Sequence, residues 1–338
     1  MEIGVIGAGS WGTSLAKLLA EKGFKVTLWV RREELRRSIS QNHENTDYLP
    51  GVLLPESLQL TSELRNAVQG KEIIVLAVPS HVVGEVVASI KFFLERGTII
   101  VNTAKGLSEG SLMRMSEVIK DRLGPDSSCK ITVLSGPNHA EEVSRLVPTA
   151  TVVASSDAAV AEKVQDIFIT SYFRVYTNPD VIGVELGGAL KNVIALAVGV
   201  CEGLNYGDNT KAALLTRGLA EITRLGVCLG AKQGTFSGLT GLGDLFVTCN
   251  SPHSRNRYVG IMLGKGHTLE EITSQMKMIA EGIKTTRVAY ELSLQYDVKM
   301  PITKEVYKVL FHKKNPREAA ANLIQRPRTH EMEEIVFQ

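Results

Sequence analysis

A lysine inside an apolar helical segment is the side chain of this sequence best suited to proton transfer. Lys191 stands between Ala189 and Asn192 in the glycine-containing run from Glu185 to Asp208. Loss of solvent disfavours the charged form of a lysine, so the pKa can fall toward the range useful for acid–base chemistry. The alternative is that the helix is buried but the side chain extends along it, so that the ammonium reaches water. The catalytic interpretation therefore depends on a partner site that needs a proton.

Such a partner site is indicated at the start of the chain, where a short apolar strand precedes the pattern G-x-G-x-x-G. Gly7 permits a tight turn, and Gly9 lets the backbone approach a pyrophosphate. Gly12 lets the following helix pack closely on the sheet. The free amides at the helix start, near Ser10 and Trp11, suit an anion. In a strand-turn-helix frame at this position, the pattern predicts a dinucleotide site and not a turn without a ligand.

The end of the second expected strand, residues 25–30, bears on the choice of cofactor. An acidic residue there would bind the 2′-hydroxyl of NAD(H), but this chain has Arg31 and Arg32. Arginine suits a 2′-phosphate through bidentate hydrogen bonds. We therefore expect NADP(H), with NAD(H) also accepted. The alternative is a solvated basic loop, because Glu33 and Glu34 follow immediately.

Polar residues at two later strand ends could bind an anionic substrate. Lys105 follows the fourth of the apolar strands, in a glycine-containing loop. The segment after the fifth strand carries Gly136, Asn138 and His139, and it could present helix-start amides to a polar ligand. The alternatives are a surface lysine and an ordinary strand-to-helix turn. His139 resembles a general base, but we do not assign it that role.

The second half of the chain adds a glycine-rich run at 238–245 and the sequence Ser-Arg-Asn. Asp244 is an acceptor for a substrate hydroxyl, and Ser254, Arg255 and Asn256 bring three polar groups to a helix start. Arginine beside helix-start amides forms a phosphate site. Alternatively, Ser254 caps a helix whose first turn is solvated. The sequence shows no metal-binding signature, so we expect no metal.

Apolar patterning predicts the elements that would bring these residues together. Up to residue 180, β-branched runs alternate with helical stretches, which predicts strands at 73–78, 98–101, 131–134, 150–153 and 173–176. Beyond residue 180 the pattern is helical, at 181–201, 211–229, 255–263, 269–276, 283–296, 303–310 and 316–323. We therefore expect an α/β fold: a Rossmann-type doubly wound, mostly parallel sheet over 1–180, then an all-α domain over 181–338. A ligand would bind where the helical domain closes over the carboxyl ends of the strands.

Composition is that of a soluble enzyme. Hydrophobic residues make up 44% and charged residues 22%, and the net charge of +2 gives no argument for nucleic acid. We expect no membrane span, because no apolar run looks long enough, and no leader, because the strand begins at once. Four widely spaced cysteines without C-x-x-C indicate a reducing compartment, so we expect a cytoplasmic protein. Apolar helices in the second domain could bury a homodimer face or only their own core.

Taken together, the motifs resemble those of the bacterial NAD(P)-dependent glycerol-3-phosphate dehydrogenase family. They occur in the family's order along nearly the whole chain: GAGSWGT, AVPS, NTAKGL, SGPNHAEE, ELGGALKN, GLNYGDNTKAAL, TGLGDL and SRN. The resemblance implies an oxidoreductase that reversibly reduces dihydroxyacetone phosphate to sn-glycerol 3-phosphate and supplies glycerophospholipid biosynthesis. Two rivals stay open: a dehydrogenase of similar design acting on a hydroxy acid or sugar nucleotide, and a non-catalytic NADP(H) sensor.

The resemblance also implies roles for individual residues. Lys191 matches the proton donor and acceptor at the substrate's C2 oxygen. The positions that match cofactor contacts, with Arg32 added for its chemistry, are Ser10, Trp11, Arg31, Lys105, Ala140, Arg255, Ile279 and Glu281. The positions that match substrate contacts are Lys105, Gly136, Asn138, Lys191, Asp244, Ser254, Arg255 and Asn256. Three positions depart from the common family residues without removing a needed charge: Trp11, Asn138 and His139.

Overall fold

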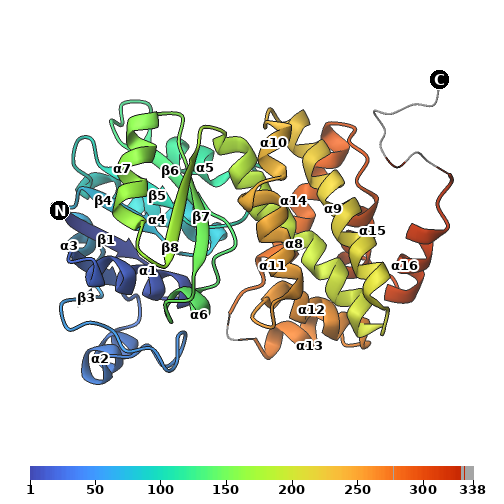
Figure 1. Cartoon of the computed structure of the whole chain (residues 1–338), viewed down its shortest axis with the longest axis horizontal. Helices are drawn as coiled ribbons and strands as arrows, with labels where there is room; N and C mark the ends of the chain where they lie inside the picture. The colour runs from blue at the N-terminus through green and yellow to red at the C-terminus, as the bar shows by residue number, and fades with distance from the viewer. Residues whose placement is uncertain (277, 329–330, 332–338) are drawn as a thin grey trace.

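The computed structural model describes residues 1–276, 278–328 and 331, and it divides the chain into a sheet-containing part and a helical part (Figure 1). The sheet has eight strands in the order β3-β2-β1-β4-β5-β6-β7-β8. Every neighbouring pair is parallel except β6 and β7. The strands are β1 Glu2–Ile6, β2 Lys25–Trp29, β3 Gln59–Thr61, β4 Ile73–Leu76, β5 Ile99–Asn102, β6 Lys130–Ser135, β7 Thr149–Ala154 and β8 Phe173–Asn178.

The expected fold class is confirmed, with one strand that was not expected from the sequence. The central strands are continuous apolar runs buried on both faces, as β4 illustrates: all four of its residues are buried, as expected for a parallel sheet covered by helices. β3 was missed because it has only three residues and none of them is fully buried, so it shows no apolar run. It lies at the edge of the sheet beside β2.

Helices cover both faces of the sheet and complete two hydrophobic cores. Leu15 of the first helix and Phe168 of the last pack in the core on one face, whereas Val87 and Ile119 belong to the core on the other. The helices are α1 Ser10–Glu21, α2 Glu33–Asn42, α3 Leu64–Val68, α4 Val83–Ile90, α5 Met115–Leu123, α6 Ala140–Val143 and α7 Ala158–Phe168. α1 starts directly after the glycine turn that follows β1.

The helical part is built around α8, Val181–Gly203, which the other helices surround (Figure 1). They are α9 Asp208–Cys228, α10 Gln233–Phe236, α11 Asp244–Asn250, α12 Arg255–Gly264, α13 Leu269–Ser274, α14 Glu281–Gln295, α15 Pro301–Phe311 and α16 Pro316–Ile324. The glycine-rich run at 238–245 contains a π-helical turn, Leu239–Gly243, that leads into α11. Glycines supply the backbone contacts of this turn, since a Cβ at Gly241 would lie 2.0 Å from the Phe236 carbonyl oxygen.

The expectation that no apolar run could span a bilayer was wrong about α8. This helix has the necessary length and composition, but 89% of its apolar window is buried inside the protein. Every residue from Gly183 to Cys201 is buried. Such a helix is apolar all round because neighbouring helices cover all of its faces. α8 is therefore the core helix of the second half of the chain.

Glycines on both helices bring α8 and α12 into direct backbone contact. A Cβ at Gly199 would lie 2.2 Å from the Arg257 carbonyl oxygen, and one at Gly203 would lie 2.2 Å from that of Ile261. On the facing helix, a Cβ at Gly260 would lie 2.2 Å from the Leu196 carbonyl oxygen. No larger residue fits at these positions without moving the helices apart. This contact fixes the start of α12 relative to the middle of α8.

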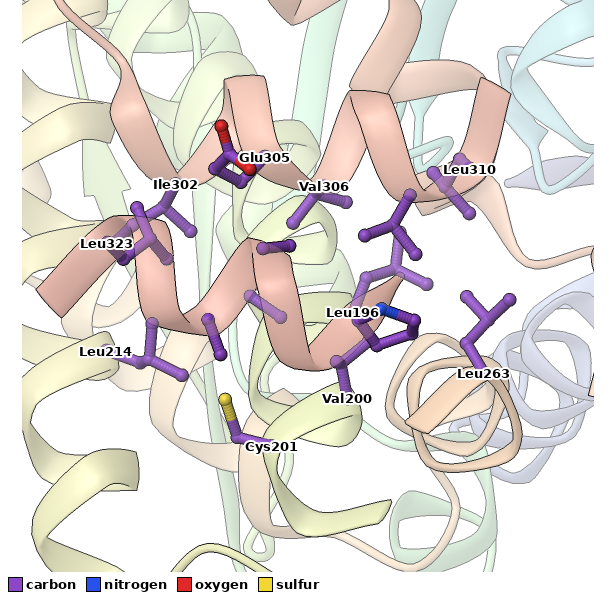
Figure 2. A pocket seen from close by; sticks show the side chains of 15 residues that line it. Leu196, Val200, Cys201, Leu214, Leu263, Ile302, Glu305, Val306, Leu310 and Leu323 are labelled. Carbon is purple, nitrogen blue, oxygen red and sulfur yellow. The ribbon is translucent and has the colours of Figure 1, made fainter. Parts of the chain in front are cut away.

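A small apolar cavity of about 30 Å³ lies elsewhere in the helical part, beneath α15 and α16 (Figure 2). Leu196, Val200 and Cys201 approach it from α8, and Val306 approaches it from α15. Glu305 is the one charged residue at its edge, and its carboxylate bonds Lys308 and Lys314. A space of this size holds about one water molecule, so it is a packing defect and not a substrate site.

Candidate active site

A cleft of about 700 Å³ lies at the carboxyl ends of the strands, where residues of the helical part join its wall. This is the crevice in which doubly wound sheets bind ligands. Fifteen of the residues singled out from the sequence line it: Gly7, Gly9, Ser10, Trp11, Arg31, Arg32, Lys105, Asn138, Ala140, Lys191, Ser254, Arg255, Asn256, Ile279 and Glu281.

The glycine turn at one end of the cleft fits a dinucleotide. Gly7 has a φ of +117°, and a Cβ there would lie 2.6 Å from the Ala77 carbonyl oxygen. Gly9 faces open space, because a Cβ placed on it would meet no atom within 4 Å. Gly12 packs against the turn itself, because its Cβ would lie 1.9 Å from the Gly7 carbonyl oxygen. The backbone is thus free to approach a pyrophosphate at Gly9, next to the first amides of α1.

A loop after α2 supports this turn from outside. The Asn45 side chain is fully buried and donates to the Ala8 carbonyl oxygen at 2.9 Å and to Thr13 Oγ1 at 2.8 Å. Ser10 Oγ donates to the Tyr48 carbonyl oxygen at 2.5 Å. Tyr48 also lines the cleft. This support was not expected from the sequence, because a loop about 35 residues away gives no local pattern that points to the turn.

The two arginines after β2 lie in different surroundings. Arg31 is exposed and makes no hydrogen bond or ion pair with the residues that the structure describes. Arg32 Nη2 bonds Asp47 Oδ2 at 2.6 Å, and its guanidinium lies 5.7 Å from the centre of the Tyr48 ring. The alternative interpretation had Glu33 and Glu34 neutralise these arginines. Glu33 instead binds two arginines of α2 itself, so the partner of Arg32 comes from a distant loop.

Lys191 lies on the buried face of α8 toward the cleft, in a polar cluster with Asp244 and Thr248 of α11. Its ammonium donates to Asp244 Oδ1 and, at 2.8 Å, to Thr248 Oγ1. Asp244 and Thr248 are four residues apart on one helix, so they share a face. Lys191 is 5% exposed and does not reach bulk water, which removes the alternative of a lysine that extends outward. An amine thus lines the cleft at a position with little exposure to solvent.

Lys105 completes the cluster from the sheet side. Its Nζ donates to Asp244 Oδ2 at 2.9 Å, to Asn138 Oδ1 at 2.8 Å and to the Gly136 carbonyl oxygen at 2.8 Å. Asn138 is in turn oriented by Thr151 Oγ1, which accepts from Asn138 Nδ2 at 2.9 Å. Asp244 therefore bridges two lysines, one from each half of the chain.

The charges and the burial in this cluster determine the pKa of Lys191. Burial lowers the pKa of Lys191 to about 7; the carboxylate of Asp244 opposes this shift, and the charge of Lys105 adds to it. Burial alone would raise the pKa of Asp244, but Lys105 and Lys191 hold it below its usual value. Asp244 therefore stays a carboxylate while Lys191 can gain or lose its proton.

The start of α12 forms the other polar wall of the cleft. Ser254 caps the helix by accepting from the Arg257 amide at 3.2 Å, and Arg255 is exposed to the cleft. Asn256 Nδ2 donates to Asn192 Oδ1 at 2.9 Å. Asn192 follows Lys191 on α8, so this bond joins the start of α12 to the lysine cluster. Helix-start amides beside a guanidinium suit a phosphate.

Two further residues of the cleft come from the loop and first turn around α14. Glu281 accepts from the Ser80 amide at 3.0 Å and from Ser80 Oγ at 2.5 Å, so it connects α14 to the loop after β4. Ile279 is 40% exposed and lines the cleft. Its neighbour Met278 contacts Ser10 at the glycine turn, with 3.7 Å between Sδ and Oγ.

His139 lines the cleft at the start of α6, and its ring centre lies 6.2 Å from that of His253. Burial, together with the charges of Lys191 and Lys105, lowers the pKa of His139 to about 4. The side chain is therefore neutral near pH 7. Its Nε2 is buried without a hydrogen-bond partner in the described structure. The sequence gives His139 no assigned role, and we propose none here.

Gly12, Gly136 and Asp244 are the three singled-out residues that do not line the cleft. Gly12 acts through helix packing, Gly136 through its carbonyl oxygen on Lys105, and Asp244 through both lysines. Asn192 and Thr248 had no expected role. Their positions in the sequence could have indicated them, because Asn192 directly follows Lys191 and Thr248 lies four residues after Asp244, on the same helix face. Within the described residues, no group of three or more His, Cys, Asp or Glu side chains could hold a metal ion.

Comparison with protein-family models gives two matches that together span most of the chain. Residues 2–161 match the model described as NAD-dependent glycerol-3-phosphate dehydrogenase N-terminus. Residues 180–321 match the model described as NAD-dependent glycerol-3-phosphate dehydrogenase C-terminus. The second match begins where α8 begins, so the lysine cluster and the start of α12 fall within it.

Individual relatives agree with the family models. The chain is 55% identical over 331 residues to a glycerol-3-phosphate dehydrogenase of the NAD(P)+ type from Moorella thermoacetica, covering 98% of each chain. It is 50% identical to one from Bacillus subtilis, covering 99% of this chain and 97% of that one. A crystal structure of glycerol-3-phosphate dehydrogenase from Coxiella burnetii superposes with a TM-score of 0.92 at 38% identity, covering 96% of this chain and 99% of that one.

Proposed function

Because the chain belongs to the NAD-dependent glycerol-3-phosphate dehydrogenase family, we propose that it reversibly reduces dihydroxyacetone phosphate to sn-glycerol 3-phosphate with NADPH or NADH. The product would supply glycerophospholipid biosynthesis. The observation that supports this chemistry is the cluster of Lys191, Asp244 and Lys105 at the cleft wall, between the glycine turn and the start of α12.

The cofactor would lie along the cleft from the glycine turn toward the lysine cluster. Gly7, Gly9 and Gly12 shape the turn, and the amides near Ser10 and Trp11 face its pyrophosphate. When bound, the reduced nicotinamide supplies the hydride for reduction of the substrate carbonyl. The remaining residues that we propose as cofactor contacts are Arg31, Arg32, Lys105, Ala140, Arg255, Ile279 and Glu281.

Lys191 would transfer the proton. Its protonated form donates a hydrogen bond to the C2 oxygen of dihydroxyacetone phosphate and delivers the proton as negative charge grows there. In the oxidation direction the neutral amine accepts that proton. A pKa lowered to about 7 lets both forms exist near neutral pH. Asp244 and Thr248 hold the ammonium in place, so little reorganisation is needed during the reaction.

The rest of the substrate would be held by the two polar walls. Arg255 and the amides at the start of α12 bind the phosphate, with Ser254 and Asn256 beside them. Lys105 lies close enough to Lys191 to contact the oxygens near C2, and Gly136, Asn138 and Asp244 hold it there. Binding energy gained at the phosphate would thus position C2, the reacting carbon, for the reaction.

Three broader assignments belong to the same proposal. We place the domain boundary between residues 180 and 181, where α8 begins after β8. We place the protein in the cytoplasm, where its small-molecule substrate and its free cysteines suit a reducing compartment. A homodimer would use the exposed apolar residues of the helical part, among them Val227 and Phe246.

Arg255→Ala tests the phosphate assignment and with it the substrate. Loss of a charge-assisted phosphate contact is expected to lower kcat/KM for dihydroxyacetone phosphate by about 10²-fold, on the order of 3 kcal/mol. At saturating NADPH, which offsets any weakened contact of Arg255 with the cofactor, dihydroxyacetone, which lacks the phosphate, should be an equally poor substrate for both proteins. The measurement is the loss of reduced-nicotinamide absorbance with each compound. Equal losses on the two compounds would show that Arg255 is not a phosphate ligand.

The same assay separates the two rival functions. A hydroxy-acid dehydrogenase would oxidise the reduced cofactor with a keto acid, and a sugar-nucleotide dehydrogenase would act on a sugar nucleotide. Neither enzyme would turn over dihydroxyacetone phosphate. A cofactor sensor would bind NADPH and turn over neither compound. The proposal requires turnover of dihydroxyacetone phosphate and little turnover of the carboxylate substrates, since the start of α12 offers a phosphate site.

A further inference from the structure

The ion pair between Arg32 and Asp47 bears on cofactor selection. Arg32 Nη2 lies 2.6 Å from Asp47 Oδ2, and the side chains are 48% and 45% exposed. The hydroxyl of Tyr48 lies 3.4 Å from the same Nη2. Arg32 lines the cleft at the end of β2, where the adenosine ribose of a dinucleotide lies in doubly wound folds, whereas Asp47 does not line it. One of the two arginines proposed for the 2′-phosphate is therefore already paired with a carboxylate.

The loop that carries Asp47 is fixed on both sides of it. Two residues earlier, the fully buried Asn45 bonds Ala8 and Thr13 at the glycine turn. One residue later, the Tyr48 carbonyl oxygen accepts from Ser10. The carboxylate cannot leave Arg32 by a movement of the loop without breaking these contacts at the turn. Its negative charge thus stays near the ribose end of the cleft.

From this arrangement we infer that Asp47 is a specificity-determining residue that limits the preference for NADPH over NADH. A 2′-phosphate carries a charge of about −1.5 to −2, and it must compete with Asp47 for Arg32. It also meets the repulsion of the carboxylate. Arg31, which has no partner among the described residues, remains free to bind it. The uncharged 2′-hydroxyl of NADH meets neither the competition nor the repulsion.

Asp47→Asn is the direct test, because it removes the charge and keeps the shape. In equilibrium titrations of the full chain, followed by reduced-nicotinamide fluorescence at low salt, the Kd for NADPH is expected to fall about three- to tenfold. The Kd for NADH should change by less than about twofold. The gain should shrink in high salt, because both side chains are exposed. Asp126→Asn removes the same charge from an exposed turn outside the cleft and should change neither Kd.

A double-mutant comparison tests whether Asp47 acts through Arg32. In an Arg32→Gln background, Asp47→Asn should improve NADPH binding much less than in the native chain. An equal improvement in both backgrounds would overturn the pairing mechanism. A weaker NADPH complex in Asp47→Asn, or equal changes for the two cofactors, would overturn the specificity role. The inference rests on the proposed cofactor contacts of Arg31 and Arg32. The titrations contain no substrate, so their outcome does not depend on whether the protein turns over dihydroxyacetone phosphate. That turnover is the separate test of the proposed reaction.

Discussion

At the scale of single residues, one carboxylate binds two lysines. Asp244 accepts from Lys191 and Lys105 with its two oxygens, and Thr248 supports the Lys191 ammonium from the next turn of α11. Burial makes Lys191 easy to deprotonate, and Asp244 keeps it from losing the proton altogether. The reactivity of Lys191 is thus a property of neighbours from separate segments of the chain.

This balance predicts the effect of Asp244→Asn on the pH dependence. In the proposed mechanism, reduction needs protonated Lys191, so kcat/KM should fall as the pH rises through the pKa of Lys191 in the free enzyme, about 7. The charge of Asp244 raises that pKa, so its removal should move the fall to a lower pH. The measurement is kcat/KM for dihydroxyacetone phosphate, followed from about two pH units below that pKa to about two above it.

Thr248→Val is the matched control for this profile, because it removes a neutral hydrogen bond to Lys191 and leaves all charges in place. It should lower the rate while moving the inflection much less than Asp244→Asn. The substrate phosphate titrates in the same way in every variant and cannot produce a difference between them. An inflection in Asp244→Asn that stays in place, or moves to higher pH, would contradict the electrostatic role of Asp244.

Residue chemistry could be predicted from the sequence where the signal was local. Lys191 stood out because a charged residue interrupts an apolar helical run, and the glycine turn was evident from its spacing. The Arg32–Asp47 pair was not predictable, because its members lie on separate loops that only the tertiary fold brings together. The role of Asp244 was likewise seen in part, as a substrate acceptor, whereas its contacts with the two lysines needed the structure.

At the scale of elements, the site is positioned by the packing of α8 against α12. The glycines of the two helices let their backbones touch, and the Asn192–Asn256 bond forms at the same crossing. Arg114 of the sheet-containing part adds a second constraint, since it bonds Glu185 on the first turns of α8 at 2.7 Å. The helix that carries Lys191 is therefore held from both halves of the chain.

Gly260→Ala is expected to disturb this crossing. The new methyl group would lie 2.2 Å from the Leu196 carbonyl oxygen, so the helices must separate. Overpacking of this kind costs about 1–3 kcal/mol, and the displaced Arg255 should raise KM for dihydroxyacetone phosphate. Urea unfolding and steady-state kinetics measure the two effects.

Gly234→Ala is the control for helix propensity, because no atom lies within 4 Å of its added Cβ in α10. Alanine there should stabilise the protein by up to about 1 kcal/mol, with no change in KM. If Gly260→Ala were as stable as Gly234→Ala and kept its KM, the helix contact would not position the site.

Element prediction succeeded for long apolar runs and failed for short elements. The long helices from 181 onward were recognised within a few residues, since their apolar faces repeat over several turns. β3, α10 and α11 were missed because three-, four- and seven-residue elements are too short to show such a repeat. α8 was recognised as a helix, and its length and composition alone match those of a membrane span, whereas its burial on every side became clear only from its neighbours.

At the scale of the whole molecule, the residues of the proposed site come from both halves. The sheet-containing part supplies the glycine turn, the two arginines and Lys105, whereas the helical part supplies Lys191, Asp244 and the start of α12. Residues of both parts line the cleft. The fold class followed from the sequence because alternating strands and helices give way to helices alone. The contacts across the cleft did not, because no periodicity encodes them.

Proton transfer by Lys191 at the substrate's C2 oxygen is the central claim, and Lys191→Met tests it most directly. Methionine keeps the length of the side chain and removes the amine. The variant should bind NADPH normally and stay folded, as thermal unfolding verifies, while Lys120→Ala on the exposed face of α5 serves as the charge control.

The decisive measurement is kcat for NADPH oxidation at saturating dihydroxyacetone phosphate. We predict a loss of about 10²- to 10⁴-fold in Lys191→Met, the range for one positioned acid–base group, and near-native turnover in Lys120→Ala. A Lys191→Met enzyme that binds NADPH and keeps near-native turnover would contradict the assignment of Lys191 as the proton donor.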